Sequence, residues 1–235
     1  MLFPTEIKNR EEHGPSTADR LYSWFKRSLD ILLSSVGLLV LAPVFAVLAV
    51  VIKVDSRGDV FYAQERIGLN RRRSRVTRRE TGERRHRDTF GRPFKIYKFR
   101  TMVTDAEKHT GAVWAQANDS RITRVGKILR KTRLDEFPQL WNVLRGEMSL
   151  VGPRPERPSF VLSLTEELPD YPKRCFALPG ITGLAQVKSK YDTSIETVNR
   201  KLAYDLYYVR HSRFMLDFKI MVATLKVMAR GEGAH

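Results

Sequence analysis

The chain has 235 residues, a formal net charge of +16 at pH 7 and a single cysteine. This length allows one domain or two small ones, and the positive charge indicates anionic partners: phosphorylated substrates, anionic lipids or nucleic acid. One cysteine, Cys175, excludes an intrachain disulfide and fits a reducing compartment. No histidine lies near Cys175 in the sequence, so it is a poor candidate for a catalytic nucleophile.

Residues 1–19 are polar and include two prolines and a glycine, which predicts a flexible tail. They do not form a signal peptide, because the apolar run begins too late and the stretch carries acidic as well as basic residues. Aromatic and basic side chains follow in Tyr22–Arg27, a mixture typical of a membrane interface.

From Ile31 to Ile52 the chain carries no charge, and about 22 apolar residues are enough to span a hydrocarbon core as a helix. Pro43 lies near the middle of this run and leaves the carbonyl of Leu39 without a helical partner. Both flanks are basic, so the positive-inside rule gives no direction across the membrane. Two interpretations stay open from the residues alone: a kinked transmembrane span, or a helix that enters, bends at Pro43 and returns to the same face.

After this run the pattern becomes that of a mixed α+β protein. Residues 60–67 and 94–100 are short and rich in aromatic and branched side chains, which predicts two strands of a hairpin. Residues 71–92 between them are dominated by arginine and cannot bury a core, which predicts a mobile basic insertion. Its charge suits anionic lipid headgroups, whereas Phe90 is its only aromatic residue, which disfavours nucleic-acid binding.

The remainder is predicted to be predominantly helical. Apolar residues recur at helical spacing over 122–129, and further helices are expected over 159–168, 196–211 and 214–228. The last is too short to span a membrane, so an amphipathic interfacial helix and a core helix both fit. In the helix expected over residues 196–211, four residues are candidates to border a pocket: Asp205, Tyr207, Tyr208 and Arg210.

The strongest functional candidates lie in residues 134–156. This stretch opens with two adjacent carboxylates, Asp135 and Glu136, and closes with Arg154 between two rigid prolines. Acids close to arginines suggest a site for a metal-bound phosphate ester.

Pro138 constrains the backbone around these acids, because proline is tolerated only in the first turn of a helix. We therefore predict a helix from near Asp135 to Leu144, with both carboxylates at its N-terminus, where free N–H groups favour anions. The alternative is that Asp135 and Glu136 only cap the helix.

Four stretches occur in a specific order and spacing: Lys98–Met102, Leu134–Asn142, Ser149–Pro155 and Pro179–Gln186. Together they resemble the bacterial polyprenyl-phosphate phosphoglycosyl transferases, also called bacterial sugar transferases. The resemblance extends from about Trp24 to about Met228, while the insertion at 71–92 is longer than the family leads us to expect.

The resemblance implies a re-entrant membrane helix over residues 20–56, broken at Pro43, and a catalytic domain over residues 57–235. This domain would lie on the cytoplasmic face of the bacterial inner membrane. The implied reaction transfers a phospho-sugar from a nucleotide sugar, usually a uridine one, to a polyprenyl phosphate and releases the nucleoside monophosphate. Such a step initiates exopolysaccharide, capsule, O-antigen or glycoconjugate synthesis.

In the implied mechanism Asp135 attacks phosphorus and forms a covalent intermediate, and Glu136 binds Mg²⁺ or handles a proton. Both carboxylates are expected to contact the metal, which neutralises the diphosphate. Six residues are expected to bind substrate, the cations by holding phosphate oxygens: Lys98, Arg100, Arg130, Pro153, Arg154 and Pro155.

Two other functions compete with this prediction: a metal-dependent glycosyltransferase that attacks the sugar carbon and releases a nucleoside diphosphate, and a basic membrane adaptor without turnover. The expected partners are the nucleotide sugar, the polyprenyl phosphate and membrane lipids, and not nucleic acid. The identity of the sugar and a homodimer are left open by the sequence.

Overall fold

The computed structural model describes residues 16–70, 90–106, 119–189 and 194–230. The predicted tail and basic insertion therefore fall mostly outside the described residues. The elements in chain order are α2 (Thr17–Asp55), β1 (Phe61–Ile67), β2 (Pro93–Phe99), α4 (Arg124–Thr132), the 3₁₀ turn η1 (Leu134–Glu136), α5 (Gln139–Leu144), β3 (Ser149–Val151), α6 (Pro158–Glu167), the 3₁₀ turn η2 (Tyr171–Phe176), β4 (Gly180–Thr182), α7 (Leu184–Lys188), α8 (Ile195–His211) and α9 (Phe214–Ala229).

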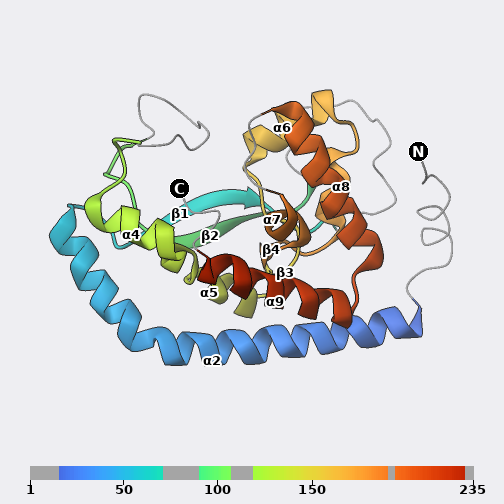
Figure 1. Cartoon of the computed structure of the whole chain (residues 1–235), viewed down its shortest axis with the longest axis horizontal. Helices are drawn as coiled ribbons and strands as arrows, with labels where there is room; N and C mark the ends of the chain where they lie inside the picture. Colours follow the sequence, from blue (N-terminus) through green and yellow to red (C-terminus); the bar gives the residue numbers. More distant parts are fainter. Residues whose placement is uncertain (1–15, 71–89, 107–118, 190–193, 231–235) are drawn as a thin grey trace.

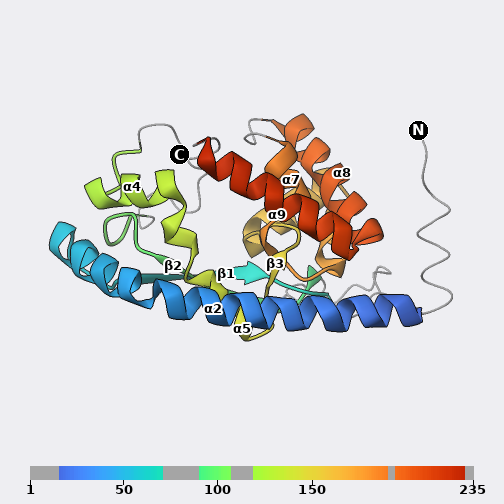
Figure 2. The ribbon, with the colours of Figure 1, turned by 60° about the horizontal axis from the view of Figure 1, so that its bottom comes forward.

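Helix α2 is the long base of the molecule, and the other labelled elements lie above it in Figure 1. Ser16 caps its N-terminus in a capping box: the Ser16 side chain accepts from the Asp19 backbone N–H, and the Asp19 side chain accepts from the Ser16 backbone N–H. The helix continues through Pro43 as one element of 39 residues and bends in its C-terminal half (Figures 1 and 2). The predicted break at Pro43 is therefore a bend within a continuous helix, because proline removes one helical hydrogen bond without ending the helix.

The two faces of α2 have opposite character. Among the described residues it is the one helix long and apolar enough to cross a membrane. Its buried residues are Asp30, Ser34 and Ile52, of which two are polar. Its exposed side chains include Trp24, Leu32, Leu39, Val40, Val47, Val50 and Val54. A long exposed apolar face marks a lipid or protein contact, and the length and composition of this helix fit membrane association.

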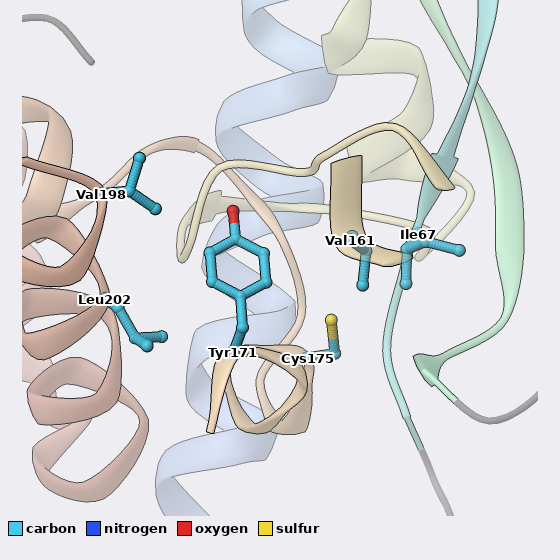
Figure 3. Packing of buried hydrophobic residues seen from close by; sticks show 6 residues of the cluster. All are labelled: Ile67, Val161, Tyr171, Cys175, Val198 and Leu202. Atoms are coloured by element: carbon cyan, nitrogen blue, oxygen red, sulfur yellow. The ribbon is translucent and has the colours of Figure 1, made fainter. Parts of the chain in front are cut away.

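The predicted hairpin is confirmed. Strands β1 and β2 pair antiparallel, with Phe61 opposite Phe99 and Ile67 opposite Pro93. The predicted helices near the C-terminal end also agree closely with α6, α8 and α9. Val198 and Leu202 of α8 pack in the core with Tyr171, as Figure 3 shows.

A second, parallel pair of strands was not predicted. Ser149 of β3 pairs with Gly180 of β4, and Val151 pairs with Thr182. The contact depends on glycine, because a Cβ atom on Gly180 would lie 2.1 Å from the backbone nitrogen of Gly152. A Cβ atom on Gly183 would lie 2.2 Å from the Gly152 carbonyl oxygen, so the backbone also approaches closely there.

We expect Gly180→Ala to destabilise the protein by about 3 kcal/mol, because the added methyl group meets backbone atoms that cannot rotate away. Denaturation of the detergent-solubilised protein measures this. Gly37→Ala is the matched control, since the nearest atom to its Cβ is Leu140 Cδ1 at 3.1 Å, the end of a flexible side chain. Equal effects of the two substitutions would contradict the assignment of close backbone packing to Gly180.

Candidate active site

The two predicted catalytic carboxylates lie in η1, a short turn between α4 and α5. Arg133 ends α4 in the left-handed conformation, with φ of 60°. Helix α5 begins only at Gln139, after Pro138. The prediction of one helix from Asp135 to Leu144 is therefore wrong, because the left-handed residue and Pro138 confine the acids to a separate turn. The helix dipole consequently gives no account of the ionisation of Asp135.

Glu136 is held by two cations from distant segments. Its Oε1 atom accepts hydrogen bonds from Lys98 Nζ at 2.8 Å and from an Arg154 guanidinium nitrogen at 2.7 Å. Burial raises the pKa of Glu136, but Arg154 and Lys98 outweigh it and hold that pKa well below its ordinary range. Glu136 is thus an ionised carboxylate that fixes two phosphate-binding candidates in one place.

Asp135 has a different environment from its neighbour. It is 7% exposed, and its carboxylate forms no hydrogen bond or ion pair with the residues that the structure describes. Burial is the main cause that raises its pKa above the ordinary value, and the charge of Glu136 adds to it, while Lys98 and Arg130 oppose it. Adjacent acids whose pKa values move in opposite directions are typical of a division of catalytic roles. Among the described residues, Asp135 is thus the acid of this turn whose carboxylate is not engaged by a cation.

The structure brings Arg130 near Asp135. Its Nε atom donates to Thr101 Oγ1 at 3.0 Å, which holds the guanidinium between α4 and the end of β2. Gly126 permits this packing, because a Cβ atom there would lie 2.1 Å from the Thr101 carbonyl oxygen. The positive charge of Arg130 lowers the pKa of Asp135 without forming an ion pair with it.

Arg100, which was predicted to bind phosphate, is not brought to the carboxylates. Its guanidinium donates to the carbonyl oxygens of Ser56, Arg57 and Ile52, at and just past the C-terminal end of α2, over 2.7 to 3.3 Å. Carbonyls at a helix C-terminus lack intrahelical donors, so Arg100 caps the long helix. It is 7% exposed and has no free face for a substrate.

Pro153 and Pro155 are buried on either side of Arg154. With Arg154 they line a small cavity that also contains Glu156 and Arg174. Neither Asp135 nor Glu136 lines this cavity, so it is not the place where a substrate would meet these carboxylates. The two prolines act on the site by fixing the backbone from which Arg154 extends.

The described residues contain no group of three or more metal-ligating side chains. Mg²⁺ commonly takes one or two carboxylates and completes its shell with substrate phosphates and water. Asp135 fits that role because its carboxylate has no partner among the described groups, whereas Glu136 is already engaged by Lys98 and Arg154. The site therefore fits Mg²⁺ if the substrate supplies most of the ligands.

Sequence reasoning missed Arg174 of η2. It is buried, lies 2.6 Å from Asp205 and donates to the backbone carbonyl of Arg154 at 2.9 Å. An arginine within the otherwise apolar and proline-marked stretch before Gly180 was the available signal.

Three of the four α8 residues expected to border a pocket have other contacts in the structure. Asp205 serves as the partner of Arg174, and Tyr208 is buried against Val151 and Asp217. Tyr207 is exposed and stacks on His211.

Helix α2 reaches both segments that carry the site. Arg27 donates to the carbonyl oxygens of Val143 (2.6 Å) and Leu144 (2.7 Å), at the end of α5. Asp30 accepts a hydrogen bond from the Leu150 backbone N–H at 3.0 Å, in β3. The first half of α2 therefore sets the distance between the carboxylate turn and the strand that leads to Arg154.

Comparisons with known proteins agree on one family. The model of the family described as bacterial sugar transferase matches residues 21–231. A UDP-N-acetylgalactosamine-undecaprenyl-phosphate N-acetylgalactosaminephosphotransferase of Aeromonas hydrophila is 38% identical over 215 residues, which cover 92% of this chain and 46% of that protein. A UDP-glucose:undecaprenyl-phosphate glucose-1-phosphate transferase of Klebsiella pneumoniae is 38% identical over 204 residues, covering 86% and 39%.

The exopolysaccharide production protein PSS of Rhizobium leguminosarum bv. phaseoli is 39% identical over 214 residues, covering 88% of this chain and 97% of that protein. This chain thus spans less than half the length of the Aeromonas and Klebsiella relatives but nearly all of the Rhizobium one.

Proposed function

Because the chain belongs to the bacterial sugar transferase family, we propose that it transfers a phospho-sugar from a UDP-sugar to undecaprenyl phosphate and releases UMP. The names of the Aeromonas and Klebsiella relatives support the two substrates, and they differ in the sugar. The name of the Rhizobium relative supports a place in exopolysaccharide production. The observation that carries the proposal is the unpaired, buried carboxylate of Asp135 beside three cations, Lys98, Arg130 and Arg154.

The proposed reaction has two displacements at one phosphorus atom. A carboxylate oxygen of Asp135 attacks the sugar-linked phosphorus, and the bond from phosphorus to the bridging oxygen breaks, so that UMP leaves with that oxygen. An oxygen of undecaprenyl phosphate then attacks the same phosphorus and releases the carboxylate of Asp135. Splitting the transfer in this way removes the need for both large substrates to be bound together.

The cations prepare the site for the donor diphosphate. Lys98 and Arg154 are held in place by Glu136 before any substrate arrives, and such preorganised charge stabilises the transition state at little reorganisation cost. Asp135 and the phosphate oxygens of the donor would hold Mg²⁺. Bound there, it would supply neutralisation of the diphosphate and of the leaving monophosphate.

The nucleotide released by the purified full chain tests this function. The chain is incubated with undecaprenyl phosphate and a panel of UDP-sugars, and UMP and UDP are measured separately. Release of UMP together with a lipid-linked sugar diphosphate supports the proposal. Release of UDP would instead show transfer to the sugar carbon, and binding to anionic vesicles without turnover would show an adaptor.

We further propose that α2 is re-entrant, with both ends on the cytoplasmic face of the inner membrane. The bend in α2, its basic flanks and the contacts of both of its ends with the rest of the fold support this path. Single cysteines at the exposed positions Ser23 and Asp59 should react with a membrane-impermeant reagent from the same side. Cys175 is buried and serves as the internal control. Labelling from opposite sides would mean that α2 spans the membrane.

The pH dependence of the first displacement should report the ionisation of Asp135. Only the carboxylate attacks, and burial raises its pKa, so the rate should fall as the pH drops through a value above the ordinary one for aspartate. Arg130 lowers the pKa of Asp135, so Arg130→Gln should move this acid limb to higher pH. Lys131→Gln, an exposed neighbour on α4, is the matched control. An acid limb that stays in place in Arg130→Gln contradicts this prediction.

A further inference from the structure

The segment Pro153–Glu156 is held through four consecutive backbone carbonyls, each bonded to a different donor, and the donors come from β1, η2 and β4. Two backbone amides donate to this segment: Gly180 N–H to the Pro153 carbonyl (2.9 Å) and Ile67 N–H to the Glu156 carbonyl (2.9 Å). Two guanidinium groups donate to the carbonyls between them: Arg174 to that of Arg154 (2.9 Å) and Arg66 to that of Pro155 (3.1 Å). Proline has no N–H group to offer, so the carbonyls are the main means of fixing this segment. Two of the four donors are side chains, and substitution can therefore remove them singly.

Arg174 is the more deeply buried of these two arginines. It is 7% exposed, pairs with Asp205 at 2.6 Å and donates to the hydroxyl oxygen of Tyr171 at 2.7 Å. Tyr171 lies between Val198 and Leu202 of α8 on one side and Val161 on the other, as Figure 3 shows. The guanidinium of Arg174 is thus fixed by core packing on one side and by an ion pair on the other.

The two arginines share one carboxylate. Glu156 lies 3.4 Å from Arg66 and 3.8 Å from Arg174. Arg66, Arg174 and Glu156 therefore form one charged cluster, and its two arginines hold the carbonyls of Pro155 and Arg154. A buried ion pair is often no better for stability than apolar residues of similar volume. The distinctive contribution of this cluster is therefore the position of the carbonyls that it bonds.

We propose that Arg174 is a positioning residue, which fixes the backbone of Arg154 so that the Arg154 side chain stays opposite Glu136. The proposal rests on the proposed function, since it assigns Arg154 to the site that binds the donor diphosphate. The side chain of Arg154 is 35% exposed and lies 2.7 Å from Glu136, so its own packing restrains it little. A backbone shift of about 1 Å from the productive geometry can cost about 100-fold in rate.

The test replaces the buried pair as a unit in the full chain. Arg174→Met with Asp205→Leu removes both charges and so avoids leaving one buried and unpaired. Arg174→Lys is a second variant, which keeps the charge but has one shorter-reaching nitrogen in place of two, of which one contacts both Asp205 and the Arg154 carbonyl and the other donates to Tyr171. We expect both to slow the formation of the covalent adduct about 100-fold, with melting temperatures close to that of the wild type. Lys173→Met with Asp170→Asn is the matched control, an exposed ion pair at 2.6 Å next to Arg174, and it should have no effect.

A double-mutant cycle separates positioning from general damage. If Arg174 acts through Arg154, the pair variant should cause no further loss of rate in an Arg154→Gln background. Losses that multiply would show that Arg174 acts independently of Arg154, and an equal loss in the Lys173 control would show a nonspecific effect. Either result overturns the proposal.

Hydrogen exchange gives a readout that needs no substrate. The amides of Gly180 and Ile67 donate to Pro153 and Glu156, so both should exchange faster in the pair variant if the segment loosens. Unchanged exchange at these amides overturns the positioning role, whatever the activity. If the wild-type chain transfers no phospho-sugar, the proposed function fails, while the exchange result still decides whether Arg174 holds this segment.

Discussion

Asp135→Asn is expected to abolish transfer, because a neutral amide is not a nucleophile that can form the acyl phosphate. The substitution changes one atom and breaks no hydrogen bond with the described residues, so the fold should be retained. In the wild type the nearby charges of Lys98, Arg130 and Arg154 all favour the ionised form of Asp135. They would also hold the phosphate in line for attack.

Intact-protein mass spectrometry measures this prediction directly. Incubation of the wild type with a UDP-sugar and no lipid acceptor should add the mass of one phospho-sugar, and peptide mapping should place it on Asp135. Asp135→Asn should gain no mass under the same conditions. An adduct on Glu136 would reverse the two roles. Turnover without any adduct, in which both substrates must bind before UMP leaves, would show direct transfer.

Glu136→Gln should reduce turnover by about 100- to 1,000-fold for a different reason. A neutral amide forms no ion pair, so Lys98 and Arg154 lose the negative charge that holds them together. Glu136 also raises the pKa of Asp135, so its neutralisation leaves the nucleophile ionised. We therefore expect slow formation of the adduct on Asp135, in contrast to its complete loss in Asp135→Asn.

Single-turnover kinetics with UDP-sugar alone distinguishes these two outcomes. Glu167→Gln, an exposed acid at the end of α6, provides the control for removing one negative charge. Wild-type rates in Glu136→Gln would mean that Lys98 and Arg154 need no carboxylate to hold them. Complete absence of adduct would mean that Glu136 takes part in the first displacement itself.

Features with a local cause could be predicted from the sequence. The hairpin followed from two short segments rich in aromatic and branched side chains, and α8 lies where a helix was expected over residues 196–211. The parallel pairing of β3 with β4 could not be predicted in the same way. It joins two strands of three residues each, and its cause is the contact of Gly152 with Gly180 across the fold.

In the candidate site, too, features with a local cause could be predicted and features that depend on distant contacts could not. The pairing of acids and cations was visible in residues 134–156, but the difference between Asp135 and Glu136 was not. They are adjacent in one turn, and their pKa values move in opposite directions because Lys98 and Arg154 bond only one of them. The position of Arg100 could not be predicted either. The sequence places it at the end of a strand, but it does not show that the C-terminus of α2 lies next to its guanidinium.

The contacts of α2 affect how a soluble form of this protein could be made. Deleting residues up to Ser56 would remove the exposed apolar face that favours aggregation. It would also remove the donors to Val143 and Leu144, the acceptor for Leu150 and the carbonyl of Ser56 that Arg100 caps. The truncated chain would gain solubility but lose packing around the turn that carries Asp135 and Glu136. Replacing the exposed valines and leucines of α2 with polar residues, while keeping Arg27 and Asp30, is the better design.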